Sequence, residues 1–209
     1  ECSLSQMNQV FMNLISNAAH AIEAESEGRP VASEIDASCF SFYANKNLTT
    51  GEGGMVVTQR DELADRLRRF RTHGIEYSED ALQFEKPGPW YYEQLELGFN
   101  YRMTDIQAKL GLSQLERLEE FVNQRNELSK RYDEALSDLP IRKQIVPRAI
   151  RSSRHLYVIR VSAKQHRSMF EFLRSAGIGV NLHYMPVHLQ PYYRSFGFSE
   201  GQYPEAEAY

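Results

Sequence analysis

The chain has 209 residues, of which 42% are hydrophobic and 25% charged, and its formal net charge is −4. These fractions exclude a disordered or fibrous protein, and the mildly acidic balance argues against general binding to nucleic acid or to a membrane surface. No apolar run approaches the roughly 18 residues that a membrane span needs. Cys2 and Cys39 make no disulfide framework, which predicts inert thiols and a cytoplasmic location.

The first half of the chain alternates between helical and strand patterns. Apolar residues at three-and-four spacing predict an amphipathic helix over 5–25. An aromatic run predicts a buried strand over 39–43, and 55–58 predicts a second short strand. Between them lies a loop rich in Gly and Thr. One apolar face predicts a helix over 61–72.

A long stretch, 74–99, follows that holds no periodic pattern, as is typical of a functional or mobile loop. A single long helix is predicted from Thr104 to about Ser137, long enough to link two domains. Beyond Pro140 the pattern predicts a strand over 155–161, a helix over 165–175 and a strand over 180–184. Another helix begins at Pro204. This order predicts a small α/β unit.

The loop after the first aromatic strand is the most informative segment. Residues 41–54 read Ser-Phe-Tyr-Ala-Asn-Lys-Asn-Leu-Thr-Thr-Gly-Glu-Gly-Gly. Its glycines allow a close approach of the backbone to a ligand. It is no nucleotide-phosphate loop, because Gly-Lys-Ser/Thr does not follow and GxGxxG is not matched. From the residues alone, Lys46 is best explained as an ordinary solvated lysine in a strand connection.

This segment closely resembles the active-lysine segment of the DegT/StrS-type nucleotide-sugar aminotransferases, which use pyridoxal phosphate on a fold-type-I scaffold. Four further motifs agree in order and spacing: 71–74, 97–103, 110–115 and 177–188. Members that make the 4-amino sugar precursor of pseudaminic acid are the nearest. The resemblance implies an α/β fold: a partial fold-type-I aminotransferase with part of the large-domain sheet, a long linking helix and a small C-terminal α/β domain.

The resemblance also implies roles for individual residues at the cofactor. Lys46 would be the catalytic lysine that joins the cofactor aldehyde and moves the proton. Ser41 would donate to the cofactor phosphate, and Asn100 would reach the phosphate bound by a neighbouring subunit. His20 would face the ring oxygen. Without the resemblance, Asn100 is a turn residue and His20 a core or surface histidine.

On the substrate side, His183 and Tyr184 would contact a keto-sugar nucleotide, and the amino donor would be a compound such as glutamate. The site would lie at the interface of a homo-oligomer. His183 and His188 make an unconvincing metal pair, because they lie five residues apart without Cys or carboxylate support, so we expect no metal.

The resemblance fails at Asn17. The family carries an acidic residue there, which keeps the pyridine nitrogen of the cofactor protonated, whereas an amide brings no charge. Residues 5–23 resemble the N-box helix of sensor histidine kinases instead. In that helix Asn13 and Asn17 would lie one turn apart, and the second would coordinate the magnesium of ATP. A polar stripe on an amphipathic helix explains both asparagines as well.

Three functions remain open at this point. Family members are roughly twice this length, so the chain resembles a second half, a chimera or fragment with a kinase-like leader (1–23), a partial large domain (24–125) and a truncated small domain (126–209). The first interpretation is a pyridoxal-phosphate-dependent transaminase, impaired or inactive as an isolated chain. The second is a non-catalytic oligomerising half-enzyme. The third is an ATP-binding fragment of a sensor kinase.

Overall fold

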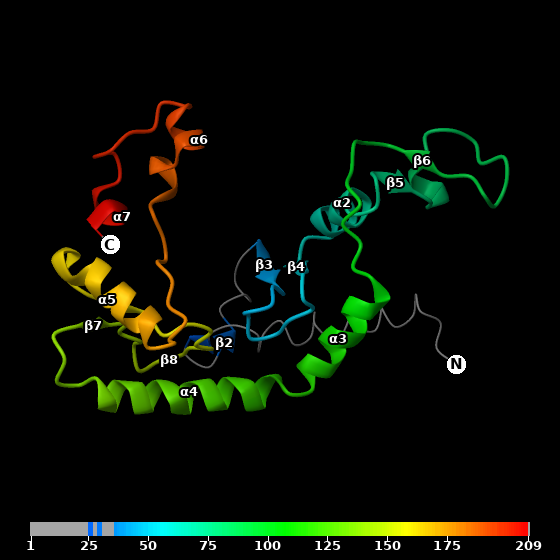
Figure 1. Cartoon of the computed structure of the whole chain (residues 1–209). Helices are drawn as coiled ribbons and strands as arrows, with labels where there is room; N and C mark the ends of the chain where they lie inside the picture. The colour runs from blue at the N-terminus through cyan, green and yellow to red at the C-terminus, as the bar shows by residue number, and fades with distance from the viewer. Residues whose placement is uncertain (1–24, 27–28, 31–35, 209) are drawn as a thin grey trace. The chain divides into compact units, whose positions relative to one another are not determined.

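The computed structural model describes residues 25–26, 29–30 and 36–208. These residues form two compact units (Figure 1). Unit 1 contains the described residues up to Tyr132 together with Val146–Leu156, and unit 2 contains Asp133–Ile145 and Tyr157 onward. The chain therefore enters unit 2, returns to unit 1 for one short segment and leaves again. The three domain ranges expected from the sequence remain predictions.

The centre of unit 1 is an antiparallel pair of strands, β3 (Ala37–Ser41) and β4 (Gly54–Thr58). In β3, Ser38 and Phe40 are buried and Cys39 and Ser41 are exposed, as expected where one face of a strand meets the core. Phe40 lies opposite Met55 in the register. The predicted strands over 39–43 and 55–58 are confirmed, with the first shifted two residues toward the N-terminus.

The core of unit 1 joins this hairpin to the following helices. Its buried apolar side chains are Phe40, Phe42, Leu48, Met55, Ala108, Leu118 and Val122. Two short strands, β1 (Glu25–Ser26) and β2 (Arg29–Pro30), pair with each other, and β1 also pairs with β8 (Ile150–Arg151). The sheets of unit 1 are thus small and antiparallel.

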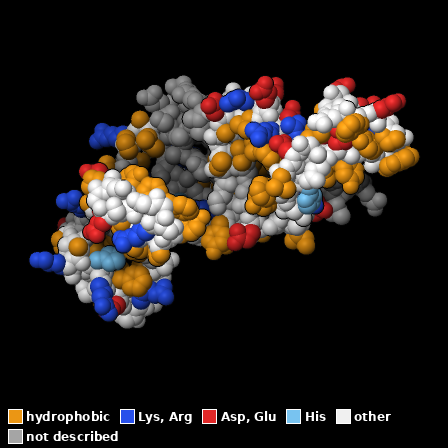
Figure 2. Space-filling view, turned by 90° about the horizontal axis from the view of Figure 1, so that it is seen from above, with side chains coloured by type: hydrophobic (Ala, Val, Ile, Leu, Met, Phe, Trp, Pro, Cys, Tyr) orange, Lys and Arg blue, Asp and Glu red, His pale blue; other side chains and the backbone are white. Residues whose placement is uncertain are grey.

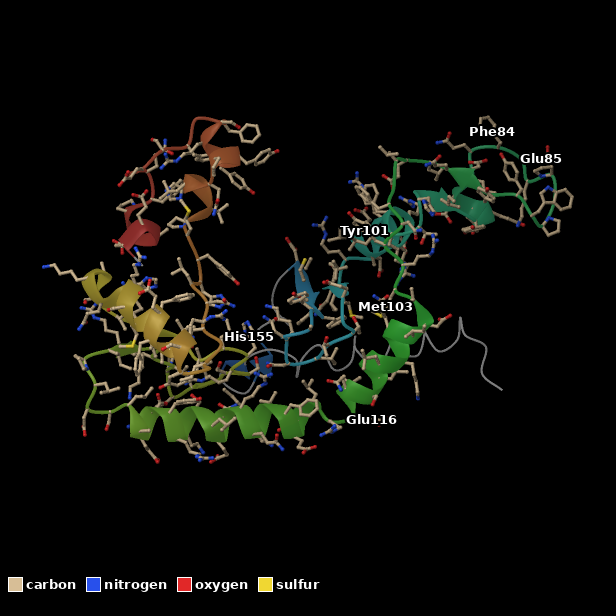
Figure 3. The ribbon with its side chains drawn as sticks, in the orientation of Figure 1. Phe84, Glu85, Tyr101, Met103, Glu116 and His155 are labelled. Carbon is tan, nitrogen blue, oxygen red and sulfur yellow. The ribbon has the colours of Figure 1, made fainter. Side chains whose placement is uncertain are left out.

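The helix predicted from Thr104 to Ser137 is wrong as a single element. The structure has α3 (Asp105–Leu115) and α4 (Leu118–Ala135), which meet at a bend beside Glu116 (Figures 1 and 3). At the bend the N–H of Arg117 bonds to the carbonyl of Gln114, three residues back, at 3.1 Å. This tighter turn accompanies the burial of Leu118 in the core.

The stretch over 74–99 is more ordered than its sequence predicts. Helix α2 (Asp61–Phe70) precedes it, and β5 (Ile75–Glu76) pairs with β6 (Glu93–Gln94) around a short 3₁₀ turn, η2 (Glu79–Ala81). Gly74 adopts φ +73°, and a Cβ there would lie 1.8 Å from the carbonyl oxygen of Glu96. Glycine is therefore needed where this hairpin closes.

Unit 2 contains short strands and one long helix. β7 (Arg142–Lys143) pairs antiparallel with β9 (Ile159–Arg160), and α5 (Ala163–Ser175) follows. Only two residues of the strand predicted over 155–161 are in strand conformation, and the strand predicted over 180–184 is wrong. The unit ends with η3 (Val187–Leu189), α6 (Pro191–Arg194) and α7 (Pro204–Ala208), so the predicted helix at Pro204 is confirmed.

No helix among the described residues is both long and apolar enough to cross a bilayer.

Candidate active site

The lysine loop, residues 42–53, is anchored at its base by Phe42. The side chain of Phe42 is fully buried. Its N–H donates to the carbonyl of Gly53 at 2.9 Å, and its carbonyl accepts the N–H of Thr50 at 3.0 Å and the hydroxyl of Thr49 at 3.1 Å. Because all three bonds converge on one core residue, the loop leaves and re-enters the hairpin at a fixed point.

Lys46 lies at the turn of this loop. Its backbone N–H donates to the carbonyl of Tyr43 at 3.0 Å, and its side chain is partly buried. Nζ lies 3.4 Å from Nε2 of His155. Ser41 ends β3 at an exposed position, where its oxygen accepts the N–H of Tyr43 at 3.4 Å. The structure therefore places Ser41 and Lys46 on the same connection between two strands.

Asn47 ties the lysine loop to a distant part of unit 1. Its side chain is 8% exposed, and its amide nitrogen donates to the carbonyl of Ser153 at 3.0 Å. Its side-chain oxygen is buried and has no hydrogen-bond partner among the described residues. An amide beside a lysine carries no sequence signal of its own, so this contact was missed from the sequence.

Gln107 holds the far side of the loop. Its side-chain oxygen accepts the backbone N–H of Thr104 at 2.9 Å, which closes a capping box at the start of α3. Its side-chain nitrogen donates to the carbonyl of Glu52 at 2.9 Å. The start of this helix was predicted from Thr104, but the second contact, made across 55 residues of sequence, was not.

Asn100 lies in unit 1 on a different segment. It pairs with Thr72 in an isolated antiparallel bridge, and its side chain is exposed. The bridge is flanked by the bond from Phe99 N–H to the carbonyl of Phe70 at 2.7 Å and by that from Tyr101 N–H to the carbonyl of Arg71 at 3.0 Å. Tyr101 and Met103 lead from here into α3 (Figure 3). Two of the recognised motifs, 71–74 and 97–103, are thus paired in space.

His183 and Tyr184 lie in unit 2, where their ring centroids are 4.5 Å apart and Tyr184 is 73% exposed. Their contact with a substrate remains a prediction. His188, in the same motif, is buried and lies 2.7 Å from a carboxylate oxygen of Glu207. His188 therefore has a structural partner within unit 2.

Asn17 and His20 lie outside the described residues, as does the whole segment 5–23 with its kinase-like pattern. Their predicted roles stay predictions. Within the described part of the chain, no cluster of three or more His, Cys, Asp or Glu side chains could hold a metal ion.

Glu93 organises the hairpin between α2 and α3. Its carboxylate accepts the N–H of Gln83 at 2.6 Å, the N–H of Phe84 at 2.9 Å and the hydroxyl of Tyr91 at 3.1 Å. Burial alone raises the pKa of Glu93, but these three donors outweigh it and lower the pKa below its ordinary value. Phe84 and Glu85 lie toward the far end of this hairpin (Figure 3).

Comparison with known proteins accounts for nearly the whole chain. The model of the DegT/DnrJ/EryC1/StrS aminotransferase family matches residues 5–209 and so includes the segment with the kinase-like pattern. The spore coat polysaccharide biosynthesis protein SpsC of Bacillus subtilis is 38% identical over 220 residues, a match to 100% of this chain and 56% of SpsC.

Two solved structures share the fold. The putative sugar aminotransferase Spr1654 from Streptococcus pneumoniae, in its PLP form, has a TM-score of 0.78 and 32% identity over 91% of this chain and 48% of its own. Helicobacter pylori PseC, an aminotransferase involved in the biosynthesis of pseudoaminic acid, has a TM-score of 0.78 and 29% identity over 96% of this chain and 55% of its own. The chain spans about half the length of the curated relatives that it matches. The predicted partial aminotransferase fold is confirmed.

Proposed function

Because this chain belongs to the DegT/DnrJ/EryC1/StrS aminotransferase family, we propose that it supplies the lysine-bearing part of a sugar aminotransferase. The reaction would move an amino group from a donor such as glutamate to a keto-sugar nucleotide. The observation that carries the proposal is the position of Lys46. Its partly exposed amine stands at the turn of a loop that is anchored in the core, on the same strand connection as Ser41.

The side chains of this connection fit pyridoxal phosphate. The cofactor, when bound, supplies an aldehyde for an amine and a ring that withdraws electrons. Lys46 offers the amine. The hydroxyl of Ser41 accepts one weak bond from Tyr43, and no described residue accepts its O–H, so it is available to donate to a phosphate oxygen. Ser41 would hold the phosphate, while Lys46 would hold the aldehyde end and move the proton.

The family motifs imply roles for residues outside this connection. The exposed side chain of Asn100 would donate to the phosphate held by a second copy of the chain, which makes the active form a homo-oligomer. His183 and Tyr184 would contact the sugar nucleotide. Asn17 and His20 would lie at the cofactor ring. These assignments rest on the family motifs, and each can be tested by substituting the single residue concerned.

The direct test uses the full chain mixed with pyridoxal phosphate. We expect visible absorbance that vanishes on borohydride reduction, with the added mass on the peptide that contains Lys46. Lys46→Ala should abolish both signals. Lys109→Ala is the matched control, because Lys109 is exposed on α3 and should leave both signals unchanged. A colourless mixture, or colour that persists in Lys46→Ala, would refute the assignment.

A second candidate function, a non-catalytic oligomerising module, is favoured by one observation. Large apolar side chains are exposed at the start of α3 and just before it: Ile106 is 85% exposed, Leu97 84% and Tyr101 73%. Figure 2 shows hydrophobic side chains gathered at the surface of the described chain. Apolar surface of this kind drives association.

Light scattering and cofactor binding together separate the two candidates. We expect a dimer or higher oligomer at tens of micromolar, shifted toward monomer by Ile106→Glu. The control Ile178→Glu, at a half-exposed position in unit 2, should not shift it. An oligomer without any cofactor signal supports the second candidate, and a monodisperse monomer refutes it.

A further inference from the structure

Lys46 makes one contact with a residue outside the family motifs. The lysine Nζ lies 3.4 Å from Nε2 of His155, although the two residues are 109 positions apart. An ammonium group carries three donors and no acceptor, so an ammonium donor in this contact assigns Nε2 as the acceptor and the ring proton to Nδ1. Both side chains are partly buried, and both belong to unit 1.

Three side chains hold the backbone that carries His155. Asn47 donates to the carbonyl of Ser153 at 3.0 Å. From α4, Asn126 donates to the carbonyl of Ser152 at 3.0 Å, and Arg125 donates to the carbonyl of His155 itself at 3.2 Å. In each of these three bonds the acceptor is thus a main-chain carbonyl oxygen between residues 152 and 155. Such bonds fix the path of an irregular segment that has no strand or helix to hold it.

The backbone conformation of Arg154, just before His155, indicates that the surrounding contacts hold this segment in one conformation. Arg154 has φ +47°, in the left-handed region that a residue with a long side chain seldom adopts. Figure 3 places His155 on the segment that follows β8. A costly backbone conformation persists only where surrounding contacts determine it. Here the three hydrogen bonds to the backbone of 152–155 determine it, and the result is that the imidazole of His155 lies beside the amine of Lys46.

We infer that His155 is a positioning residue for the amine of Lys46, an inference that rests on the proposed function of that lysine. The long side chain of lysine loses conformational freedom when it is held, and a hydrogen bond to a fixed imidazole supplies the restraint. A carboxylate in this place would hold the ammonium as an ion pair. A neutral acceptor orients the amine without an opposing charge, so the amine is free to leave it for a carbonyl substrate.

The experiment measures the reactivity of Lys46 in the full chain without any cofactor. The amines are acylated with a limiting amine-selective reagent, and labelling of each lysine is followed by peptide mass spectrometry. Lys109 and Lys164, both exposed, are internal references. The variants are His155→Gln, whose side-chain oxygen can replace Nε2 as the acceptor, and His155→Leu, which has similar bulk but no acceptor. His166→Leu, at an exposed position on α5, is the control.

We expect Lys46 in His155→Leu to be acylated about fivefold faster than in the unaltered chain, because the amine loses the acceptor that holds it and is free to meet the reagent. His155→Gln and His166→Leu should keep the original rate. If the Leu and Gln variants both match the unaltered chain, or both depart from it equally, the inference is wrong.

A second measurement needs no variant. Long-range proton–nitrogen NMR of the unaltered chain should show His155 protonated on Nδ1, and protonation on Nε2 alone would overturn the inference. These experiments can support the role of His155 even where the proposed function fails. If Lys46 forms no chromophore with pyridoxal phosphate and yet reacts faster in His155→Leu, the proposed function fails and the positioning contact stands.

Discussion

The side chain of Gln107 joins Glu52 of the lysine loop to the first turn of α3: its nitrogen donates to the carbonyl of Glu52 at 2.9 Å while its oxygen caps the helix. The two contacts use opposite ends of one amide, so they can be separated by substitution. Glutamate keeps the capping oxygen and loses the donor. Alanine loses both.

We expect Gln107→Glu to preserve α3 and to loosen the lysine loop. Hydrogen exchange at the amide of Thr104 should stay as slow as in the unaltered chain, whereas the amides of residues 50–53 should exchange faster. Gln107→Ala should speed exchange at both places and cost about 1 kcal/mol through loss of the cap. Equal protection of the amides of residues 50–53 from hydrogen exchange in all three proteins would show that the contact with Glu52 does not stabilise the lysine loop.

A second prediction concerns Gly74 and Gly98, whose backbones approach each other closely. A Cβ at Gly98 would fall 2.1 Å from the nitrogen of Gly74 and 2.5 Å from the carbonyl carbon of His73. Backbone atoms cannot move aside as a flexible side chain can, so Gly98→Ala should break the bond from His73 N–H to the carbonyl of Phe99. We expect a loss of about 2 kcal/mol in the free energy of unfolding.

Gly179→Ala is the control for that measurement. A Cβ at Gly179 would meet no atom within 4 Å, so its effect on urea denaturation should stay within about 0.5 kcal/mol. A Gly98→Ala chain as stable as the Gly179→Ala chain would contradict the observed packing.

The lysine loop could be recognised from the sequence because its residues are contiguous. Ser41 and Lys46 belong to one uninterrupted run, whose aromatic strand and glycines each have a local meaning. The contact with His155 could not be recognised, since it joins positions 109 apart and the strand predicted over 155–161 gives His155 no partner. The bend beside Glu116 was missed for another reason: no Gly or Pro marks it, and tertiary packing of Leu118 overrides the helical pattern.

The carboxylate of Glu207 gives a prediction about pH. It accepts the N–H of Gly201, at 2.8 Å to one oxygen, the imidazole of His188 at 2.7 Å and the N–H of Tyr203 at 3.3 Å. The Gly201 N–H first, and then His188, hold the pKa of Glu207 below its ordinary value. A depressed folded-state pKa means stabilisation that is complete above the unfolded value of about 4.3 and is lost as pH falls through the folded value.

We therefore expect the amide of Gly201 to be protected from hydrogen exchange near neutral pH and to lose that protection, relative to its intrinsic rate, in the acid range below about pH 4.3. Glu207→Gln should remove the protection already at neutral pH. Glu205→Gln, two residues away on the same helix and exposed, is the matched control and should behave as the unaltered chain. An amide of Gly201 that is equally protected in Glu207→Gln would rule out this role.

Under the proposed function, we predict that amino transfer is slow because Asn17 is an amide. The resemblance implies a carboxylate at this position that would keep the pyridine nitrogen of the cofactor protonated, and an amide brings no charge to do so. Loss of one well-placed electrostatic partner costs on the order of 100- to 1000-fold in rate.

The assay measures amino transfer from glutamate to a 4-keto sugar nucleotide, with Lys46→Ala as the blank. We expect turnover below about one per second, the low end of ordinary enzyme rates. Asn17→Asp should raise the rate by less than the full factor, since orientation of the substrate matters as well, and Asn13→Asp should leave it unchanged. Turnover by the unaltered chain at about one per second or faster would show that Asn17 imposes no such limit.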